Sequence, residues 1–217
     1  MIGFVTGLRA EARIAGRIGT ARAGGGTPDG ARRAALALVA DGAWALVSFG
    51  LAGGLDPTLS AGDMVDAAEI LADGIRYETD PGLVASLMGR PFGTIVATST
   101  VIATAAEKAA LRAETSALAV DLESGAVALV AKKANLPFAV LRAVCDPATR
   151  NLPQAALVAL DAHGAIGGWR VARAVLGRPR DIAGLLALAR DAGLARAALV
   201  GRVGQIGCLD ADLSRFR

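Results

Sequence analysis

Four short segments of the chain carry residue types that could act together on a small substrate. Carboxylates lie in residues 6–11, 121–126 and 142–148, and buried carboxyl groups can donate or accept protons near neutral pH. Residues 48–55, SFGLAGGL, are small enough for backbone N–H groups to approach a ligand closely. Each segment follows an apolar run that is typical of a buried strand. The four segments are therefore expected to meet outside the carboxyl ends of a sheet, where α/β proteins bind ligands.

Apolar runs and helical patterns alternate along the first 150 residues. Strands are expected at residues 2–6, 45–49, 64–71, 93–98, 117–121 and 138–145, and helices at 8–15, 31–40, 104–114 and 124–135. Glycine-rich stretches at 24–30 and 50–54 predict a loop and a turn, and Thr104 with Glu107 predicts a capping box. Beyond residue 150 the chain is expected to be mainly helical, with breaks near Gly167, Pro179, Gly193 and Gly201. This alternation predicts a single domain over residues 1–217, a three-layer α/β/α fold with a mixed central sheet.

The composition is that of a globular protein, which we expect in the cytoplasm. Of the 217 residues, 53% are hydrophobic and 20% are charged, which argues against a disordered chain. No stretch reaches the roughly 18 uninterrupted apolar residues of a membrane-spanning helix. The apolar N-terminal run precedes its positive charges, unlike a secretory signal, and two cysteines imply no disulfide framework. The net charge of +3 comes from dispersed arginines, so no nucleic-acid partner is expected.

Several common sites are not expected in this chain. The glycine turn at 50–54 does not match a GxGxxG dinucleotide fingerprint, and no acidic residue follows at the required spacing. The single histidine, His163, is far along the chain from Cys145, which argues against a Cys–His nucleophile pair and against a zinc site. Cys145 is therefore interpreted as a buried structural thiol, and neither a metal nor a cofactor is expected.

The four segments together resemble, in the same order, those of the nucleoside phosphorylase and nucleosidase superfamily. The resemblance rests on FGLAGGLDP at 49–57 with AGDMV at 61–65, DLESGA at 121–126, LPF at 136–138 and RAVCD at 142–146. It covers most of residues 1–147. The resemblance implies an enzyme that cleaves the N-ribosidic bond of a purine nucleoside. It also implies a homo-oligomer, because members of this superfamily commonly assemble from identical subunits.

The resemblance assigns roles to two acidic residues. Asp146 would face N7 of the purine and donate a proton to the leaving base, which requires a raised pKa. Glu123 would accept hydrogen bonds from the ribose hydroxyls. The other residues expected to bind substrate are Asp121, Leu122, Ala52, Gly53, Ser99 and Ile102. The aromatic candidates for stacking on the base are Phe49, Phe92 and Tyr77.

Two alternatives remain for the group that attacks the sugar. Glu11 matches a glutamate that activates water in the hydrolytic branch of the superfamily. Arg9 matches an arginine that binds phosphate in the phosphorolytic branch, where Gly7 and Thr98 would also contact phosphate as a co-substrate. Ser48 and Leu51 stand where hexameric phosphorylases carry an arginine and a serine, and this departs from their phosphate site.

The tail resembles one branch of the superfamily, the hopanoid-associated phosphorylases. This resemblance rests on residues 146–148, 151–153, 178–179 and 185–188, and the branch is linked to removal of adenine from adenosylhopane. The resemblance to this branch slightly favours phosphorolysis of adenosylhopane over hydrolysis. The alternative is hydrolysis of methylthioadenosine or S-adenosylhomocysteine, and a further alternative is a non-catalytic module that binds adenine or a nucleoside.

Two stretches of the tail place apolar residues at helical spacing. They are Trp169, Ala172 and Leu176, and Ile182, Leu185, Leu186 and Ala189. The ordinary interpretation is core packing or an oligomer face. The functional alternative is a basic amphipathic surface, peripheral to the inner membrane face, through which a lipid-linked nucleoside reaches the site.

Overall fold

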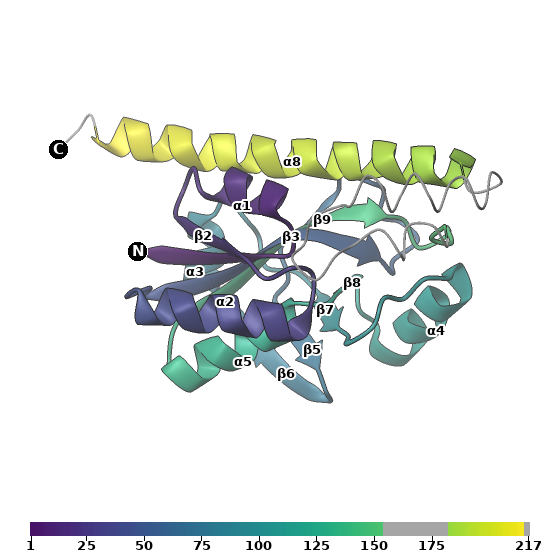
Figure 1. Cartoon of the computed structure of the whole chain (residues 1–217), viewed down its shortest axis with the longest axis horizontal. Helices are drawn as coiled ribbons and strands as arrows, with labels where there is room; N and C mark the ends of the chain where they lie inside the picture. The colour runs from purple at the N-terminus through teal and green to yellow at the C-terminus, as the bar shows by residue number, and fades with distance from the viewer. Residues whose placement is uncertain (154–181, 215–217) are drawn as a thin grey trace.

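Strands rich in Val, Ile, Leu and Ala form the centre of the molecule. The computed structural model describes residues 1–153 and 182–214 (Figure 1). Nine strands of these residues form one mixed sheet. They are β1 (Ile2–Thr6), β2 (Thr20–Ala23), β3 (Ala45–Gly54), β4 (Met64–Val65), β5 (Glu69–Ala72), β6 (Ile75–Glu78), β7 (Thr94–Ala97), β8 (Ala119–Asp121) and β9 (Phe138–Asp146).

The long strand β3 joins the two halves of the sheet. It pairs in parallel with β1 on one side and with β9 on the other, and the β9 pairing ends with Gly53 opposite Asp146. The last residues of β3 also pair with β8 in antiparallel orientation, with Gly53 opposite Val120. Strands β7, β5 and β6 follow β8 in the sheet. The carboxyl end of β3 therefore holds the ends of β8 and β9 close together.

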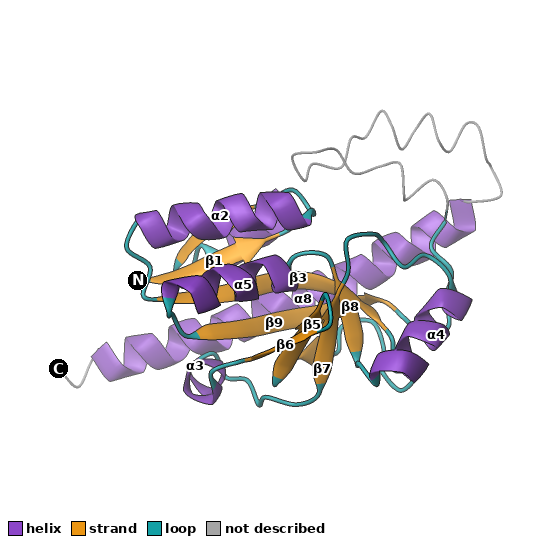
Figure 2. Ribbon diagram, turned by 90° about the horizontal axis from the view of Figure 1, so that it is seen from below, coloured by secondary structure: helices purple, strands orange, loops and turns teal. Residues whose placement is uncertain are grey.

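Helices cover both faces of the sheet (Figures 1 and 2). They are α1 (Arg9–Ala15), α2 (Pro28–Ala40), α3 (Pro81–Ser86), α4 (Ala105–Thr115), α5 (Ser124–Ala134) and α8 (Ile182–Ser214). On one face α2 and α5 bury Leu38 and Val127 in a cluster with Val5. On the other face α1 and α8 bury Ile14 and Leu199 in a second cluster. These two cores confirm the predicted α/β class with a mixed central sheet.

Some elements differ from those predicted. The predicted turn at 50–54 is wrong, because β3 continues through these glycines while β9 provides hydrogen-bonding partners beside it. The predicted strand at 64–71 is two strands, β4 and β5. Helix α2 begins at Pro28, before the predicted residue 31, because the Thr27 hydroxyl accepts the N–H of Gly30 and proline suits the first turn.

The chain from residue 182 forms one long helix. Helix α8 passes through Gly193 and Gly201, where breaks were predicted, because Ala195, Leu199 and Val203 follow each other at one-turn spacing and pack on the sheet. The predicted breaks at Gly167 and Pro179, and the stretch from Trp169 to Leu176, lie outside the described residues. Among the helices that the structure describes, none has the length and apolar character needed to cross a membrane.

Candidate active site

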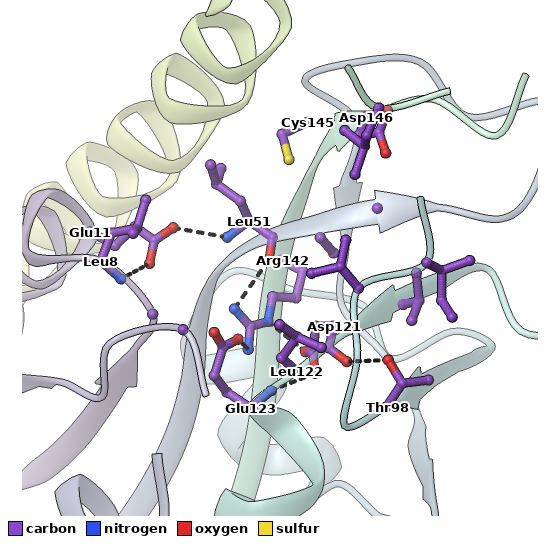
Figure 3. A pocket seen from close by; sticks show the side chains of 18 of the residues that line it. Leu8, Glu11, Leu51, Thr98, Asp121, Leu122, Glu123, Arg142, Cys145 and Asp146 are labelled. Carbon is purple, nitrogen blue, oxygen red and sulfur yellow. Dashed lines mark hydrogen bonds and ion pairs between the residues drawn. The ribbon is translucent and has the colours of Figure 1, made fainter. Parts of the chain in front are cut away.

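The carboxyl ends of β1, β3, β7, β8 and β9 surround a cavity of about 270 Å³ (Figure 3). Glu123 and Asp146, the two acidic side chains on which the enzyme hypothesis depends, both line it. The cavity brings together most of the residues that the sequence suggested for the site. They are Glu11 and Asp146 for catalysis, Gly7 and Thr98 for phosphate, and Ala52, Gly53, Ile102, Asp121, Leu122 and Glu123 for substrate. The four segments therefore meet where α/β proteins bind ligands.

Arg142 is the charged centre of the cavity lining. Strand β9 carries this side chain, which is only 1% exposed. Its Nη2 donates hydrogen bonds to Oε2 of Glu123 at 2.9 Å and to Oγ of Ser48 at 2.8 Å, and Nη1 donates to the carbonyl oxygen of Leu51 at 3.3 Å. Its Nε lies 2.8 Å from Oδ2 of Asp121, an ion-pair distance. The two carboxylates thus neutralise a buried guanidinium, which in turn fixes their positions.

Glu123 directly precedes α5 but does not cap it. Asp121 performs that role, because its Oδ1 accepts the N–H groups of Glu123 at 3.1 Å and Ser124 at 2.9 Å. The Glu123 side chain is therefore free to face the cavity. Burial raises its pKa to about 7, against the lowering effect of the Arg142 charge, and the charges of Asp121 and Glu11 raise it further. This carboxyl group can gain or lose a proton near neutral pH.

Glu11 reaches the same end of the cavity from the first turn of α1. Its Oε2 accepts the N–H of Leu8 at 2.8 Å, and its Oε1 accepts the N–H of Leu51 at 3.3 Å. Burial raises the pKa of Glu11, while these N–H groups and the Arg142 charge lower it. A buried carboxylate with a raised pKa is suited to accept a proton from water.

Two glycines leave room for these charged groups. A Cβ on Gly7 would lie 2.7 Å from Oε1 of Glu123. A Cβ on Gly50 would lie 2.8 Å from Oε2 of Glu11 and 2.9 Å from Nη1 of Arg142. Gly50 also has a φ of +151°, which L-residues rarely adopt. A side chain at either position would displace the charged groups.

Asp146 stands apart from Glu11 and Glu123, on another side of the cavity (Figure 3). Its Oδ2 accepts a hydrogen bond from Nζ of Lys108 at 2.5 Å. Its Oδ1 is buried and has no hydrogen-bond partner among the described residues. Burial raises the pKa of Asp146, and the hydrogen bond and charge of Lys108 lower it. The carboxyl group thus keeps one oxygen for a ligand.

The thiol of Cys145, next to Asp146, is not ionised near neutral pH. Cys145 lines the cavity, and burial beside Asp146 raises the pKa of its thiol to about 12. The thiolate is the nucleophilic form of cysteine, so Cys145 is not a nucleophile near neutral pH. This agrees with its interpretation as a structural thiol.

Two of the suggested site residues lie elsewhere. Arg9 is exposed and lines a separate cleft with Arg22 and Arg33. The reason is geometric: residues two apart on a helix point in nearly opposite directions, and Glu11 takes the inward direction. Ser99 is exposed and is not part of the cavity lining.

The aromatic candidates for base stacking also lie outside the cavity. Phe49 is in the core, edge-on to Phe4 with ring centroids 6.0 Å apart. Tyr77 lies under Nζ of Lys132, and Phe92 is 72% exposed. The part of the cavity that the structure describes is instead lined by aliphatic side chains, including Val101, Ile102, Leu122, Leu152 and Leu188.

Comparison with known proteins agrees with this site. The sequence model of the Phosphorylase superfamily matches residues 9–174, which is more than half of the chain. The chain belongs to the Phosphorylase superfamily. This membership confirms the expected family, and with it an enzyme of the nucleoside phosphorylase and nucleosidase kind. No curated protein sequence matches the chain.

Solved structures share the superfamily fold. A 5′-methylthioadenosine/S-adenosylhomocysteine nucleosidase from Helicobacter pylori is 17% identical, with a TM-score of 0.67, over 94% of this chain and 97% of that one. The futalosine hydrolase of Helicobacter pylori strain 26695 gives the same values. A nucleosidase from Colwellia psychrerythraea 34H, in complex with adenine, is 18% identical, with a TM-score of 0.63, over 81% of this chain and 94% of that one.

Two charged residues of this superfamily member were not predicted to act at the site. Arg142 does carry a sequence signal, because a charge inside the otherwise apolar run FAVLRAVCD must find a buried partner. Lys108 carries none, since AAEKAALRAET resembles the surface of any amphipathic helix. Only its contact with Asp146 distinguishes it.

Proposed function

We propose that this protein hydrolyses the N-ribosidic bond of a purine nucleoside whose 5′ substituent is apolar. The observation that carries the proposal is the shared cavity, in which Glu11 and Glu123 occupy one end and Asp146 another. Cleavage of such a bond needs a group that assists the leaving base, a group that holds the sugar and a nucleophile. The cavity offers one carboxyl group for each task.

The proton donor in this proposal is Asp146. Its Oδ1, which has no partner among the described residues, would face N7 of the purine. Burial raises the pKa of Asp146, which favours the protonated form that can donate a proton. General acid assistance of this kind contributes on the order of 10²- to 10⁴-fold in rate.

Glu123 is the residue that binds the sugar in this proposal. Its Oε2 is held by Arg142, while its Oε1 borders the space that Gly7 leaves open. A carboxylate fixed in this way can accept hydrogen bonds from the ribose hydroxyls and orient the ring, and charge-assisted bonds of this type are about twice as strong as neutral ones.

The nucleophile assigned here is water, activated by Glu11. The preference of the sequence for phosphorolysis came from the branch that the tail resembles. Arg9, the only cation among the residues expected to bind phosphate, lies outside this cavity. Among the described lining residues Arg142 is the only cation, and Asp121 and Glu123 already neutralise it. A phosphate dianion next to Glu11 and Glu123 would meet like charges, whereas a water molecule would not.

The aliphatic lining supports an apolar 5′ group. Methylthioadenosine carries a small group of this kind, and adenosylhopane carries a large one. Phosphorolysis of adenosylhopane is the second candidate, and exposed apolar residues of α8 favour a lipid-linked substrate. Leu186 is 67% exposed and Ile182 is 43% exposed on the helix that also supplies Leu188 to the cavity.

Release of adenine with and without phosphate tests the proposal. Adenosine, methylthioadenosine and adenosine with a 5′ alkyl chain are each incubated with the protein, and adenine and the sugar product are quantified by chromatography. We expect release without phosphate, with free sugar as product. A strict phosphate requirement with a sugar 1-phosphate product would exclude hydrolysis. Binding of adenine without any release would favour the non-catalytic alternative.

Two matched variants test the nucleophile. Glu11→Gln should abolish hydrolysis, because an amide cannot accept the proton of water. Glu78→Gln, the same change at an exposed position of β6, should leave the rate unchanged. Equal rates in both variants would exclude Glu11 as the base.

A further inference from the structure

Lys108 is an unusual residue for its position in the fold. It is the one buried residue of α4, and its side chain is fully buried. Helices normally bury apolar side chains at such a place, and removing an ammonium group from water is strongly unfavourable. A buried lysine here therefore needs a specific set of partners.

The partners of Lys108 all lie at the end of β9 and just beyond it. Its Nζ donates hydrogen bonds to Oδ2 of Asp146 at 2.5 Å, to the carbonyl oxygen of Pro147 at 3.0 Å and to that of Arg150 at 3.0 Å. An ammonium group has three donors, so all of them are used. The side chain cannot turn away without losing several bonds at once, and Asp146 is therefore held by a fixed cation.

We propose that Lys108 is a positioning residue for the proton donor: it holds Asp146 so that only Oδ1 faces the leaving base, and its charge stabilises the carboxylate that remains. This inference rests on the proposed function, and it assigns Lys108 no direct contact with the substrate. The bond to Oδ2 and the absence of a described partner for Oδ1 are the two observations behind it.

The step balances with water, the nucleophile of the proposed function, as the other reactant. When the bond between C1′ and N9 breaks, its electron pair passes to the purine, and C1′ forms a bond to the water oxygen while Glu11 accepts a proton of that water. The proton of the Asp146 carboxyl group moves from Oδ1 to N7 of that purine. Asp146 is left as a carboxylate beside the Lys108 ammonium group, which keeps its own protons throughout. Without that cation, the new carboxylate would be buried and unpaired.

Other charged or titratable groups near Asp146 do not replace Lys108. Arg150 lowers the pKa of Asp146 and Asp191 on α8 raises it, and these two residues pair with each other. The Cys145 thiol, with a pKa of about 12, is neutral over the working range. Lys108 is thus the cation whose removal changes the charge around Asp146 most directly.

Lys108→Met is the main test. We expect the alkaline limb of the pH profile of kcat to shift to higher pH by at least about one unit. The reason is that the substitution removes the nearby positive charge that favours the ionised form of Asp146. We also expect kcat at the optimum to fall at least about tenfold, because the remaining acid is weaker and less well oriented. Lys108→Arg keeps the charge, so its alkaline limb should stay near that of the wild type, with part of the rate recovered.

A matched variant separates this effect from loosening of α4. Arg112 lies one turn further along α4, where Nη2 is 2.5 Å from Oδ2 of Asp56 and Nη1 donates to the carbonyl oxygen of Ala117 at 2.8 Å. Arg112→Met also removes an ion pair of α4, but one without contact to Asp146. Its alkaline limb should match that of the wild type. If both Met variants shift equally, Lys108 acts only through the helix and the inference is wrong.

Direct titration of Asp146 provides a readout independent of turnover. The protein is labelled with ¹³C-aspartate, and the Asp146 signal is assigned from its loss in Asp146→Asn. The carboxyl group should titrate at higher pH in Lys108→Met, or in Lys108→Gln if the Met variant does not fold. If a Lys108 variant is active but neither the titration of Asp146 nor the alkaline limb of its kcat profile changes, the inference is wrong and the proposed function stands. If the wild-type protein releases no base, the proposed function is wrong as well.

Discussion

Replacing Arg142 by methionine tests whether electrostatic pairing holds the charged centre of the cavity. The substitution keeps a long side chain but removes a buried cation that pairs with Asp121 and Glu123. Removing one partner of a buried ion pair costs roughly 3–5 kcal/mol, because the remaining charge is neither solvated nor paired. For a chain of this size, where 1 kcal/mol shifts the melting temperature by about 2–4 °C, the expected decrease is about 6–20 °C.

The loss of stability should depend on pH. In the folded protein the pKa of Glu123 is raised from 4.5 to about 7, so the stabilising effect of its protonated form is lost as the pH rises through that value. Without Arg142 the folded pKa is higher still, and keeping Glu123 buried at alkaline pH costs more. The free-energy difference between wild type and variant should therefore be larger at about pH 9 than at about pH 5.5.

Urea unfolding followed by circular dichroism at both pH values provides the measurement. Arg22→Met is the matched control, because Arg22 also pairs with a carboxylate, Asp41, at 2.5 Å, but with a side chain that is 45% exposed. The control should lose less than about 1 kcal/mol. If Arg142→Met is no less stable than Arg22→Met, or if its deficit is the same at both pH values, the electrostatic reasoning fails.

Three further substitutions probe the site. Asp146→Asn should keep the circular dichroism spectrum but reduce the rate of base release by about 10²- to 10⁴-fold, and an unaffected rate would exclude Asp146 as the proton donor. Gly7→Ala places a Cβ 2.7 Å from Oε1 of Glu123 and should lower kcat/KM at least about tenfold. Gly193→Ala, with open space at its Cβ, is the control for that change, and equal kinetics in the two would count against the assigned role of Glu123. Cys145→Ala should stay within about threefold of the wild-type rate, because its thiol is not ionised near neutral pH; a large loss would show that Cys145 takes part.

Hydrophobic pattern predicted the elements that bury a continuous apolar run. Strands β1 and β9 and helices α4 and α5 all appear where the sequence placed them, within a few residues. Strands β2 and β6 were not predicted, because most of their residues are partly or fully exposed and show no apolar run. In β3 the glycines suggested a turn, but tertiary pairing with β9 outweighs their local preference.

The acidic residues of the site were predictable, but their partners were not. Asp146 is the last residue of β9, and Glu123 lies two residues after β8. Each is close in the sequence to glycine, proline or another acidic residue. The partner of each carboxylate depends on contacts between distant segments: Arg142 lies 19 residues from Glu123, and Lys108 lies 38 residues from Asp146. The failure to place Arg9 arose because one helix turn cannot aim both Arg9 and Glu11 at the same cavity.

Helix α8 forms part of the cavity wall through Leu188, and glycines interrupt a sequence that is otherwise rich in strong helix formers. Gly193, Gly201, Gly204 and Gly207 lie along it, each with open space where a Cβ would stand. Each glycine costs about 1 kcal/mol relative to alanine, so together they subtract roughly 4 kcal/mol from helix stability. The packing of Leu199 and Val203 in the core offsets part of this loss. Unwinding the turn around Gly193, near the cavity, requires less free energy than it would with alanine at that position.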